Sequence, residues 1–425
     1  MENNIFKLTD EHSKKIGLDL QAKIQEGLKE SGKEIACLPT YINPGEELKE
    51  KVKNFVGKIL VLDWGGTNFR AAIVSLKKGE KPVVVETLKK TLSAKELEGF
   101  KGEDLHREMA SLIVQLKELD NTVTHIGYCF SYEAESTLDG DAILLRWAKG
   151  MNISDMLNKL VGRPLVDYLN KYEGIKGKTE FKTVKVINDT IACLFAGLEQ
   201  PGYDSYIGLI VGTGNNMAAV IPAKQIQKLD KNYKGGEFIP VNLESGNLRM
   251  YSERPDGYLT EIDKKVDLCF PPEQEQLFEK AMSGRYVGAI FSNYFSGMEI
   301  DPEFDGKSLT DMLNYPAIYK DECVTVAREI YVRSAQLTAA SLAGLTLVLV
   351  SYKNEKDFDK SISSVCLAAD GSLFWSKDKN GLDYSELVKK YLKIYLQSYG
   401  LGDIHFHFSK LEDPNLIGSA IAALS

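Results

Sequence analysis

Two short glycine turns carry the groups that could hold a phosphate: Asp63-Trp64-Gly65-Gly66-Thr67-Asn68 and Gly212-Thr213-Gly214-Asn215-Asn216. Glycine lets a backbone approach a ligand closely, and successive N–H groups in such a turn can form an anion-binding nest. Each threonine adds a hydroxyl donor. Neither turn carries the lysine or leads into the helix of a Walker loop, because strand-like residues follow both. A single turn of this kind is more often an ordinary hairpin. Two matched turns favour a clamp on one nucleotide, as in a kinase or an ATPase.

A carboxylate suited to acid–base chemistry lies in Val186-Ile187-Asn188-Asp189-Thr190, between a β-branched run and a helical segment. Asn, Asp and Thr all favour the N-cap of a helix, which is the simpler interpretation of this segment. The alternative is that Asp189 accepts the proton of an attacking hydroxyl during phosphoryl transfer. At the first turn, Asp63 could hold Mg²⁺ through water.

If the acceptor of the phosphoryl group were uncharged and rich in hydroxyls, such as a hexose, its pocket would need carboxylates, amides and a lysine. The chain has such residues, but spacing alone does not select them from its 60 acidic side chains. The candidates of these types are Asn188, Asp189, Asn216, Glu244, Glu279 and Lys149.

The elements that must position these residues form two α/β units. Strand-like runs flank each glycine turn, at 58–62 and 69–76 and at 207–211 and 217–221, with further strands at 83–87, 123–130, 184–187, 345–350 and 364–369. Helical spacing appears at 10–32, 105–119, 190–198, 274–295, 322–343 and 418–424. The similarity of the two turns, in equivalent places, indicates a weak internal repeat.

Composition narrows the class of protein. The 425 residues predict two or three domains, with 44% hydrophobic and 26% charged residues, as in soluble globular proteins. A net charge of −8 argues against nucleic acid and anionic membranes as partners. The N-terminus has no apolar core of a secretory signal, and six scattered cysteines predict free thiols, so we expect a cytoplasmic protein.

His405 and His407 alternate along a predicted strand, so they share one face of it. An exposed strand face is a simpler interpretation than a metal site, because no third ligand is nearby in the sequence.

Several blocks, in one order along the chain, resemble the eukaryotic-type hexokinase family. They cover roughly residues 38 to 424 and are Leu38-Pro39-Thr40-Tyr41, Val61–Arg70, Phe130-Ser131-Tyr132, Arg146–Gly150, Asn188-Asp189-Thr190, Ile210–Asn216, Glu244 with Gly246, Leu277–Lys280 with Ser283–Tyr286, and Ala369–Ser372. Each block is short, but order and spacing together make the resemblance specific.

The resemblance implies a role for each matching residue. Asp189 would be the general base, with Lys149 and Arg70 beside the reaction. The hexose, glucose first among the candidates, would contact Ser131, Ala148, Lys149, Asn188, Asp189, Asn216, Glu244 and Glu279. ATP would contact Asp63, Gly65, Gly66, Thr67, Asn68, Gly212, Thr213, Gly214, Arg285 and Gly371. Mg²⁺ would be held through water by Asp63, with Asp189 as a second candidate.

The resemblance also implies a fold, the actin-like duplicated ribonuclease-H-like fold, with two α/β lobes around a cleft. The small lobe would span 59–189, with 415–425 as a candidate further piece, and the large lobe 1–58 plus 190–414. The lobes would close over the sugar and exclude water. Monomer and homodimer both stay open.

The chain departs from the family pattern at several positions. Ala148 replaces a usual threonine, Glu133 a proline and Ser245 a tryptophan, which bears on sugar choice. Leu411-Glu412-Asp413-Pro414-Asn415 replaces a glycine- and serine-rich stretch that contacts nucleotide, which bears on the phosphoryl donor. Three alternatives to an ATP-dependent glucose kinase therefore stay open: a sugar-sensing regulator, an ATPase of the same fold, and a kinase with another hexose or donor.

Overall fold

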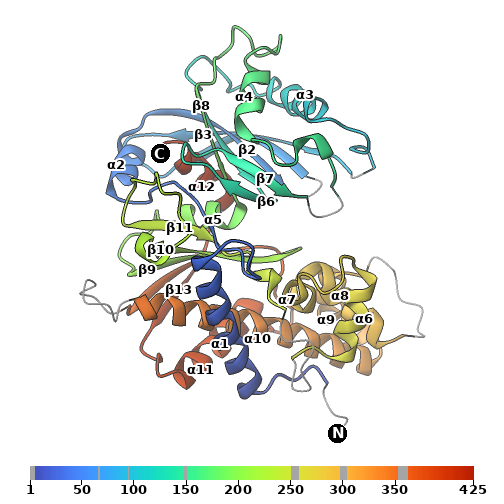
Figure 1. Cartoon of the computed structure of the whole chain (residues 1–425). Coiled ribbons are helices and arrows are strands. Elements are labelled where there is room, and N and C mark those ends of the chain that lie inside the picture. The colour runs from blue at the N-terminus through green and yellow to red at the C-terminus, as the bar shows by residue number, and fades with distance from the viewer. Residues whose placement is uncertain are drawn as a thin grey trace. The chain divides into compact units, whose positions relative to one another are not determined.

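The computed structural model describes residues 5–65, 68–93, 95–147, 151–249, 258–296, 304–352 and 362–425. The chain forms two compact units (Figure 1). Unit 1 comprises Met1–Cys37, Leu209–Met217 and Leu243–Phe408, and unit 2 comprises Leu38–Gly208, Ala218–Asn242 and Ser409–Ser425. The boundaries of these units differ from those of the two lobes expected from the sequence. The lobe boundaries remain a prediction.

Unit 2 is built on a five-stranded sheet in the order β4-β3-β2-β5-β8. Its strands are β2 (Gly57–Gly65), β3 (Asn68–Leu76), β4 (Val83–Thr91), β5 (His125–Phe130) and β8 (Thr183–Ile187). β3 lies antiparallel to both β2 and β4, whereas β2, β5 and β8 are parallel to one another. These strands confirm the runs predicted between residues 58 and 187.

The central strand β2 is buried on both faces, and its side chains alternate between two cores. Leu60, Leu62 and Trp64 join the core that includes α3 (Gly102–Ile113) and α4 (Gly162–Leu169). Ile59 and Val61 join the core that includes α2 (Glu46–Asn54), α5 (Asp189–Gly197) and α12 (Pro414–Ala422). A short hairpin, β6 (Glu133–Ser136) with β7 (Ala142–Arg146), forms a separate two-stranded sheet in this unit.

Helix α12 packs at backbone distance against its neighbours in unit 2. A Cβ built on Gly418 would lie 1.8 Å from the carbonyl oxygen of Ala192 in α5. A Cβ built on Gly127 of β5 would lie 2.1 Å from the carbonyl oxygen of Ser419 in α12. Only glycine fits at both positions, so α12 is wedged between α5 and the sheet.

The second sheet has the order β1-β11-β10-β9-β12-β13. Its strands are β1 (Leu38–Pro39), β9 (Ser205–Val211), β10 (Asn215–Pro222), β11 (Phe238–Asn242), β12 (Ser364–Asp370) and β13 (His405–Lys410). Taken in chain order, β11-β10-β9-β12-β13 repeats the arrangement of β4-β3-β2-β5-β8: third, second, first, fourth, fifth. The weak internal repeat in the sequence is therefore confirmed as a repeated strand order.

The helices of unit 1 surround one long helix. They are α1 (Asp10–Lys29), α6 (Glu261–Cys269), α7 (Leu277–Met282), α8 (Gly284–Tyr294), α9 (Gly306–Asn314), α10 (Asp321–Ser351) and α11 (Tyr384–Ser398). Among the described residues α10 alone is long and apolar enough to cross a membrane, but 83% of its most apolar window is buried in the protein. It contacts α1 and α11 and is a core helix.

The strand predicted at 345–350 is wrong, because α10 continues through it to Ser351. The run Leu345–Val350 is β-branched in part but buried among helices, and tertiary packing overrides its strand preference. The helix predicted at 274–295 is also wrong as a single helix. It is broken at Ser283, which has extended backbone angles of −80° and 162° and separates α7 from α8.

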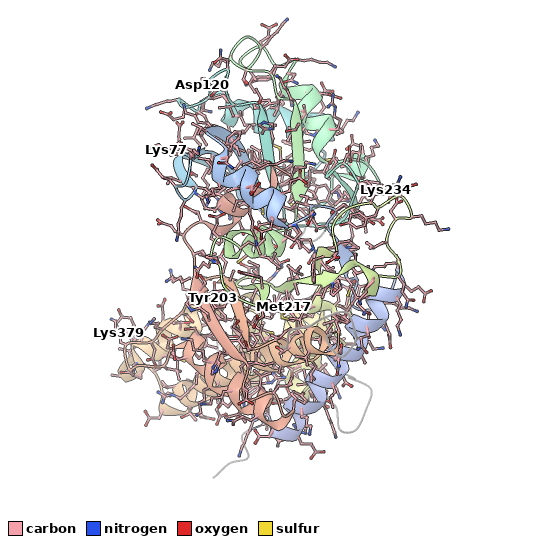
Figure 2. The ribbon with its side chains drawn as sticks, turned by 90° about the vertical axis from the view of Figure 1, so that its left-hand side faces the viewer. Lys77, Asp120, Tyr203, Met217, Lys234 and Lys379 are labelled. Carbon is pink, nitrogen blue, oxygen red and sulfur yellow. The ribbon has the colours of Figure 1, made fainter. Side chains whose placement is uncertain are left out.

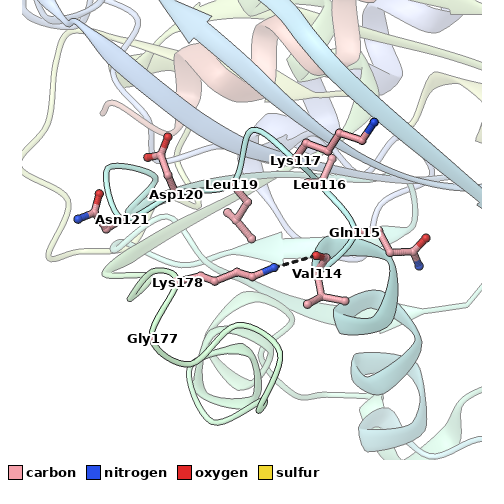
Figure 3. Close-up of a pocket in the computed structure, with 9 residues that line it drawn as sticks. All are labelled: Val114, Gln115, Leu116, Lys117, Leu119, Asp120, Asn121, Gly177 and Lys178. Atoms are coloured by element: carbon pink, nitrogen blue, oxygen red, sulfur yellow. Dashed lines mark hydrogen bonds between the residues drawn. The ribbon is translucent and has the colours of Figure 1, made fainter.

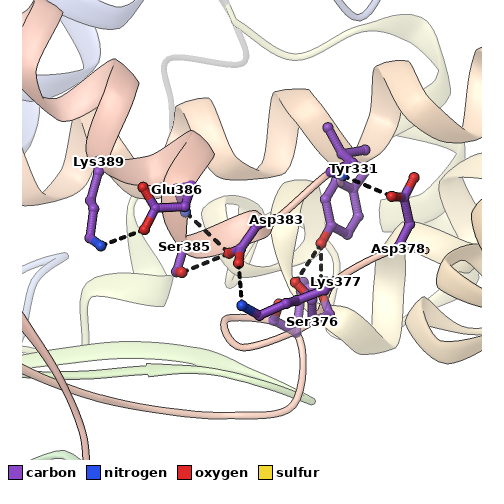
Figure 4. A network of polar contacts seen from close by, with 10 residues as sticks. Tyr331, Ser376, Lys377, Asp378, Asp383, Ser385, Glu386 and Lys389 are labelled. Carbon is purple, nitrogen blue, oxygen red and sulfur yellow. Dashed lines mark hydrogen bonds and ion pairs between the residues drawn. The ribbon is translucent and has the colours of Figure 1, made fainter. Parts of the chain in front are cut away.

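The connection from β12 to α11 is held by a polar network (Figure 4). Asp383 caps α11 by accepting the Glu386 N–H and also pairs with Lys377 at 2.8 Å. The Tyr331 hydroxyl of α10 contacts the Ser376 hydroxyl at 2.7 Å. These contacts fix the segment that follows Gly371.

His106, on α3 in unit 2, makes the stability of that unit sensitive to acid. The side chain is 9% exposed and its ring lies 5.8 Å from that of Tyr168. Burial lowers the pKa of His106 to about 4, with Asp155 opposing the shift. Between pH 6.5 and 4 the unfolded chain binds a proton that the folded chain does not, so stability is lost as pH falls through this window.

The wild type should lose about 3 kcal/mol of its free energy of unfolding between pH 6.5 and pH 4, at about 1.36 kcal/mol per pH unit. We expect His106→Phe to remove this loss, because phenylalanine takes up no proton. The measurement is the urea midpoint at a series of pH values. His405→Phe, at an exposed position, is the control and should keep the wild-type slope. An unchanged slope in His106→Phe would refute the assignment.

Candidate active site

In unit 2 the carboxyl ends of three parallel strands bring the predicted residues of that unit to one edge of the sheet. Asp63 of β2 pairs in register with Cys129 of β5, and Cys129 with Ile187 of β8. Asn188 and Asp189 follow Ile187 directly. Parallel strands end at the same edge, where open α/β sheets bind ligands.

Asn188, rather than Asp189, caps helix α5. The Asn188 Oδ1 accepts the N–H of Thr190 at 2.9 Å and lies 2.6 Å from its hydroxyl. Asp189 is the first residue of the helix and is half-buried, with one oxygen also accepting the Thr190 N–H at 2.9 Å. The capping role that competed with catalysis is thus performed by the neighbouring residue.

Asp63 is held by an arginine from the adjacent strand. Its Oδ2 accepts hydrogen bonds from Nε (2.8 Å) and Nη2 (2.5 Å) of Arg70, opposite it in the β2–β3 register. Burial raises the pKa of Asp63 above its ordinary value, and this outweighs the lowering by Arg70 and by the Cys129 thiol. The charge of Asp189 also raises this pKa, so the two carboxylates influence each other.

The same edge places the remaining described candidates of unit 2. Ser131 is 8% exposed, and its N–H donates to the carbonyl of Trp64 at 3.0 Å. A Cβ built on Gly65 would lie 3.2 Å from the Ser131 hydroxyl, so the first glycine turn begins against this serine. Asn68 opens β3, is exposed, and accepts a hydrogen bond from Thr91.

Three residues at this edge were missed by sequence reasoning: Cys129, Asn242 and Asp413. Asn242 lies 3.3 Å from the Thr190 hydroxyl and lines a small cavity with Asn188. Asp413 accepts a hydrogen bond from Arg70 Nη1 at 3.0 Å. No sequence signal marked Cys129 or Asn242, because their contacts join segments far apart in the chain. Only the unusual acidic pair at 412–413 pointed to Asp413.

In unit 1 the second glycine turn is packed against two further backbone segments. The N–H of Gly284 donates to the Gly212 carbonyl at 2.7 Å, and that of Arg285 to the Thr213 carbonyl at 3.2 Å. Gly371 has a φ of 115°, and a Cβ there would lie 2.2 Å from the carbonyl oxygen of Val211. Glycine is therefore required at Gly371 by both its φ and its surroundings. The break at Ser283 serves this turn, because its hydroxyl donates to Thr213.

The three predicted hexose residues of unit 1 lie beside this turn. Glu279 on α7 accepts the N–H of Asn215 at 2.8 Å. The Oδ1 of Asn216 accepts the N–H of Ser245 at 3.1 Å, which brings the segment after Glu244 against β10. Glu244 has a φ of 57°, a left-handed conformation uncommon for its type. The structure thus brings Asn216, Glu244 and Glu279 into one cluster next to Gly214.

The other candidates are placed less closely or not at all. The exposed guanidinium of Arg285 lies over the rings of Phe270 and Tyr286, each at 5.7 Å. The predicted residues Gly66, Thr67, Ala148 and Lys149 lie outside the described residues. His405 and His407 are both exposed on β13, and the described part of the chain holds no group of three metal-ligating His, Cys, Asp or Glu side chains.

A larger open pocket of about 540 Å³ lies elsewhere in unit 2 (Figure 3). It is lined by Val114–Lys117, Leu119–Asn121, Gly177 and Lys178, with Lys178 Nζ bonded to the Val114 carbonyl at 3.1 Å. Asp120 at its rim is ion-paired with Lys58, and Figure 2 shows it near the surface. No predicted site residue lines this pocket, so size does not identify the candidate site.

A buried ion pair fixes the helix that carries Glu279. Lys280 Nζ lies 2.6 Å from Asp267 Oδ1, and both side chains are only 4% exposed. We expect Lys280→Met to destabilise the protein by about 3–5 kcal/mol, because Asp267 is left buried without its counter-charge. Urea denaturation followed by tryptophan fluorescence measures this.

Lys264→Met, which removes an exposed pair with Glu261, is the matched control and should unfold close to the wild type. The exposed and buried variants behaving alike would contradict the prediction. If the double variant Lys280→Met with Asp267→Leu recovers stability, the loss is due to the unpaired charge rather than to the changed volume.

Comparison with known proteins adds to this geometry. Two hexokinase family profiles match residues 2–198 and 206–314. The chain is 26% identical to hexokinase-1 of Arabidopsis thaliana over 93% of this chain and 84% of that protein. It is 30% identical to hexokinase HKDC1 of Homo sapiens over 67% of this chain, an alignment that spans 30% of the human protein. It is 32% identical to hexokinase-1 of Spinacia oleracea, over 62% of this chain and 53% of that protein.

Solved structures agree on the fold. A hexokinase from Schistosoma mansoni, complexed with glucose, superimposes on this chain with a TM-score of 0.79 at 23% identity. The match covers 99% of this chain and 96% of that one. A glucokinase from Balamuthia mandrillaris, in complex with glucose, gives a TM-score of 0.57 at 14% identity, over 90% of this chain and 100% of that one.

The repeated strand order agrees with the fold of these solved structures, and the two family profiles identify the chain as a hexose kinase, an enzyme that phosphorylates a sugar. The predicted actin-like α/β fold is confirmed through its hexokinase relatives. The chain belongs to the hexokinase family, whose two profiles together match more than half of it.

Proposed function

We propose that this hexokinase transfers the γ-phosphoryl group of ATP to the 6-hydroxyl of glucose or a related hexose. The observation that carries the proposal is the edge of the unit 2 sheet, where Asn188 caps α5 and leaves Asp189 for chemistry beside Asp63 and Arg70. The unit 1 cluster of Asn216, Glu244 and Glu279 beside Gly214 supplies the amide and carboxylates that a hexose needs.

In the proposed reaction Asp189 accepts the proton of the 6-hydroxyl as its oxygen attacks the γ-phosphorus. The bond from that phosphorus to the bridging oxygen breaks, and ADP leaves. Arg70 lies beside this carboxylate edge and offsets negative charge there. The glycine turns offer backbone N–H groups to the donor phosphates. The proposal includes closure of the lobes over the sugar, which would exclude water.

The residues fit a magnesium ion that accompanies the nucleotide. Mg²⁺ is commonly bound through one or two carboxylates, waters and substrate phosphates, and Asp63 with Asp189 provides two carboxylates at one edge. Asp63 already accepts two hydrogen bonds from Arg70, so a contact with Mg²⁺ through water fits it better than direct coordination. Bound there, Mg²⁺ would neutralise phosphate charge.

The test is ADP release by purified protein with MgATP, with and without glucose. Glucose-dependent release that yields glucose 6-phosphate is the expected result. Release that is independent of sugar would favour the ATPase alternative. No release, with glucose still changing tryptophan fluorescence, would favour a sugar sensor.

The preferred hexose also has to be determined. Ser245 bears on it, because this residue follows the proposed sugar ligand Glu244. The serine is fully buried, and its hydroxyl has no hydrogen-bond partner in the described structure. It stands where the resemblance expects tryptophan, so the side chain that follows Glu244 is much smaller than the family pattern implies. Comparing kcat/KM for glucose, mannose and fructose ranks the substrates.

A further inference from the structure

Arg70 is shared between two carboxylates rather than paired with one. Its Nε and Nη2 bond Asp63 at 2.8 and 2.5 Å, and its Nη1 bonds Asp413 at 3.0 Å. Asp63 and Asp413 come from β2 and from the residue before α12, on either side of the guanidinium. All three nitrogens of Arg70 therefore contact protein carboxylates.

The two carboxylates differ in how accessible they are. The Asp63 side chain is 9% exposed and makes two bonds, whereas the Asp413 side chain is 40% exposed and makes one. A ligand that approaches Arg70 from solvent therefore meets Asp413 and not Asp63. An ion pair of this exposure is worth at most about 1 kcal/mol, so a multiply charged phosphate can displace Asp413 from Arg70.

The position of Asp413 is built into the fold. Its backbone is left-handed, with φ of 44° and ψ of 51°, and Pro414 begins α12 directly after it. Because α12 is wedged between α5 and the sheet, residue 413 is held next to β3 whatever its side chain. The carboxylate can rotate away from Arg70, but its charge stays in the neighbourhood.

We propose that Asp413 competes with the phosphates of the donor for Arg70 and so weakens donor binding. The inference rests on the proposed function, which places the donor phosphates at this edge. One guanidinium and two carboxylates carry a net charge of −1 there, which repels a polyphosphate that is incompletely neutralised by Mg²⁺. Asp413 thereby lowers the affinity of the site for the nucleotide donor.

The test is Asp413→Asn, with KM for MgATP, KM for glucose, kcat and the calorimetric Kd for MgADP measured at two salt concentrations. Asparagine tolerates the left-handed conformation and keeps an oxygen that accepts from Arg70, so only the charge is lost. We expect KM for MgATP and Kd for MgADP to fall about twofold to fivefold at low salt, and less at high salt. KM for glucose should not change.

Glu412→Gln is the matched control, because it removes the same charge from an exposed neighbour for which no contact with Arg70 is found in the described structure. An unchanged or raised KM for MgATP in Asp413→Asn overturns the inference while leaving the proposed function intact. Equal effects in both variants also overturn it, since a general change of surface charge would explain them. If the wild type shows no turnover, the proposed function fails, and MgADP binding alone decides: tighter binding by Asp413→Asn supports the competition and equal binding refutes it.

Discussion

Asp189→Asn is expected to lower kcat for hexose-dependent ADP release by about 10²- to 10⁴-fold, the usual contribution of a general base. The variant keeps an oxygen that can accept the Thr190 N–H, so the start of α5 should be preserved. Asn188 remains as the cap. The loss would therefore reflect proton transfer and not a disrupted helix.

The control is Asp167→Asn, which changes an exposed aspartate of α4 in the same unit and should retain wild-type turnover. KM for glucose in Asp189→Asn should change far less than kcat, because hydrogen bonds to the sugar are mostly kept. If Asp189→Asn retained more than a tenth of wild-type kcat, the general base would have to be sought elsewhere.

The second large effect is expected for Glu279→Gln. A hydrogen bond from a hydroxyl to a carboxylate contributes about 1.5–3 kcal/mol and one to a neutral amide about 0.5–1.5 kcal/mol, so KM for glucose should rise roughly 5- to 15-fold. Glutamine can still accept the Asn215 N–H that Glu279 accepts at 2.8 Å, so the second glycine turn should keep its shape. Steady-state kinetics with both substrates varied would measure the change.

KM for MgATP distinguishes the two roles that Glu279 could have. The residue touches the turn at Gly214, where a nucleotide phosphate is expected, as well as the hexose cluster. A rise in KM for MgATP without a rise in KM for glucose would assign Glu279 to the nucleotide and remove it from the sugar pocket. Glu261→Gln, on the exposed side of α6, is the control.

The strands of unit 2 were predictable from the sequence because each is a local signal. The runs that became β2, β3 and β5 are β-branched or apolar and end in turn residues, and these signals need no tertiary partner. The repeat was visible only as two similar turns. The repeated strand order that explains it depends on pairing between distant strands, as in β9 with β12.

What the sequence could not give was decided by packing. The run Leu345–Val350 has the composition of a strand, yet it lies within α10, where Leu345, Thr346, Val348 and Leu349 are buried. The same holds for the candidate site: residue types can be read from the sequence, but contacts between distant segments cannot. The types of Asp63, Asn188 and Glu279 suggested their roles, whereas the sharing of Arg70 with Asp413 joins residues 343 positions apart.

The wedged position of α12 has a consequence for how the protein is made. Helix α12 is part of the core of unit 2, but it is the last element of that unit to be synthesised. The segment Leu243–Phe408, which belongs to unit 1, is made before it and after the other segments of unit 2. At 5–20 residues per second, the ribosome needs on the order of ten to thirty seconds for that stretch. During this interval Ile191, Leu194 and Phe195 of α5 lack the α12 residues that share their hydrophobic core, such as Leu416 and Ile421. Unit 1, whose last segment ends at Phe408, can therefore complete its fold before unit 2 does.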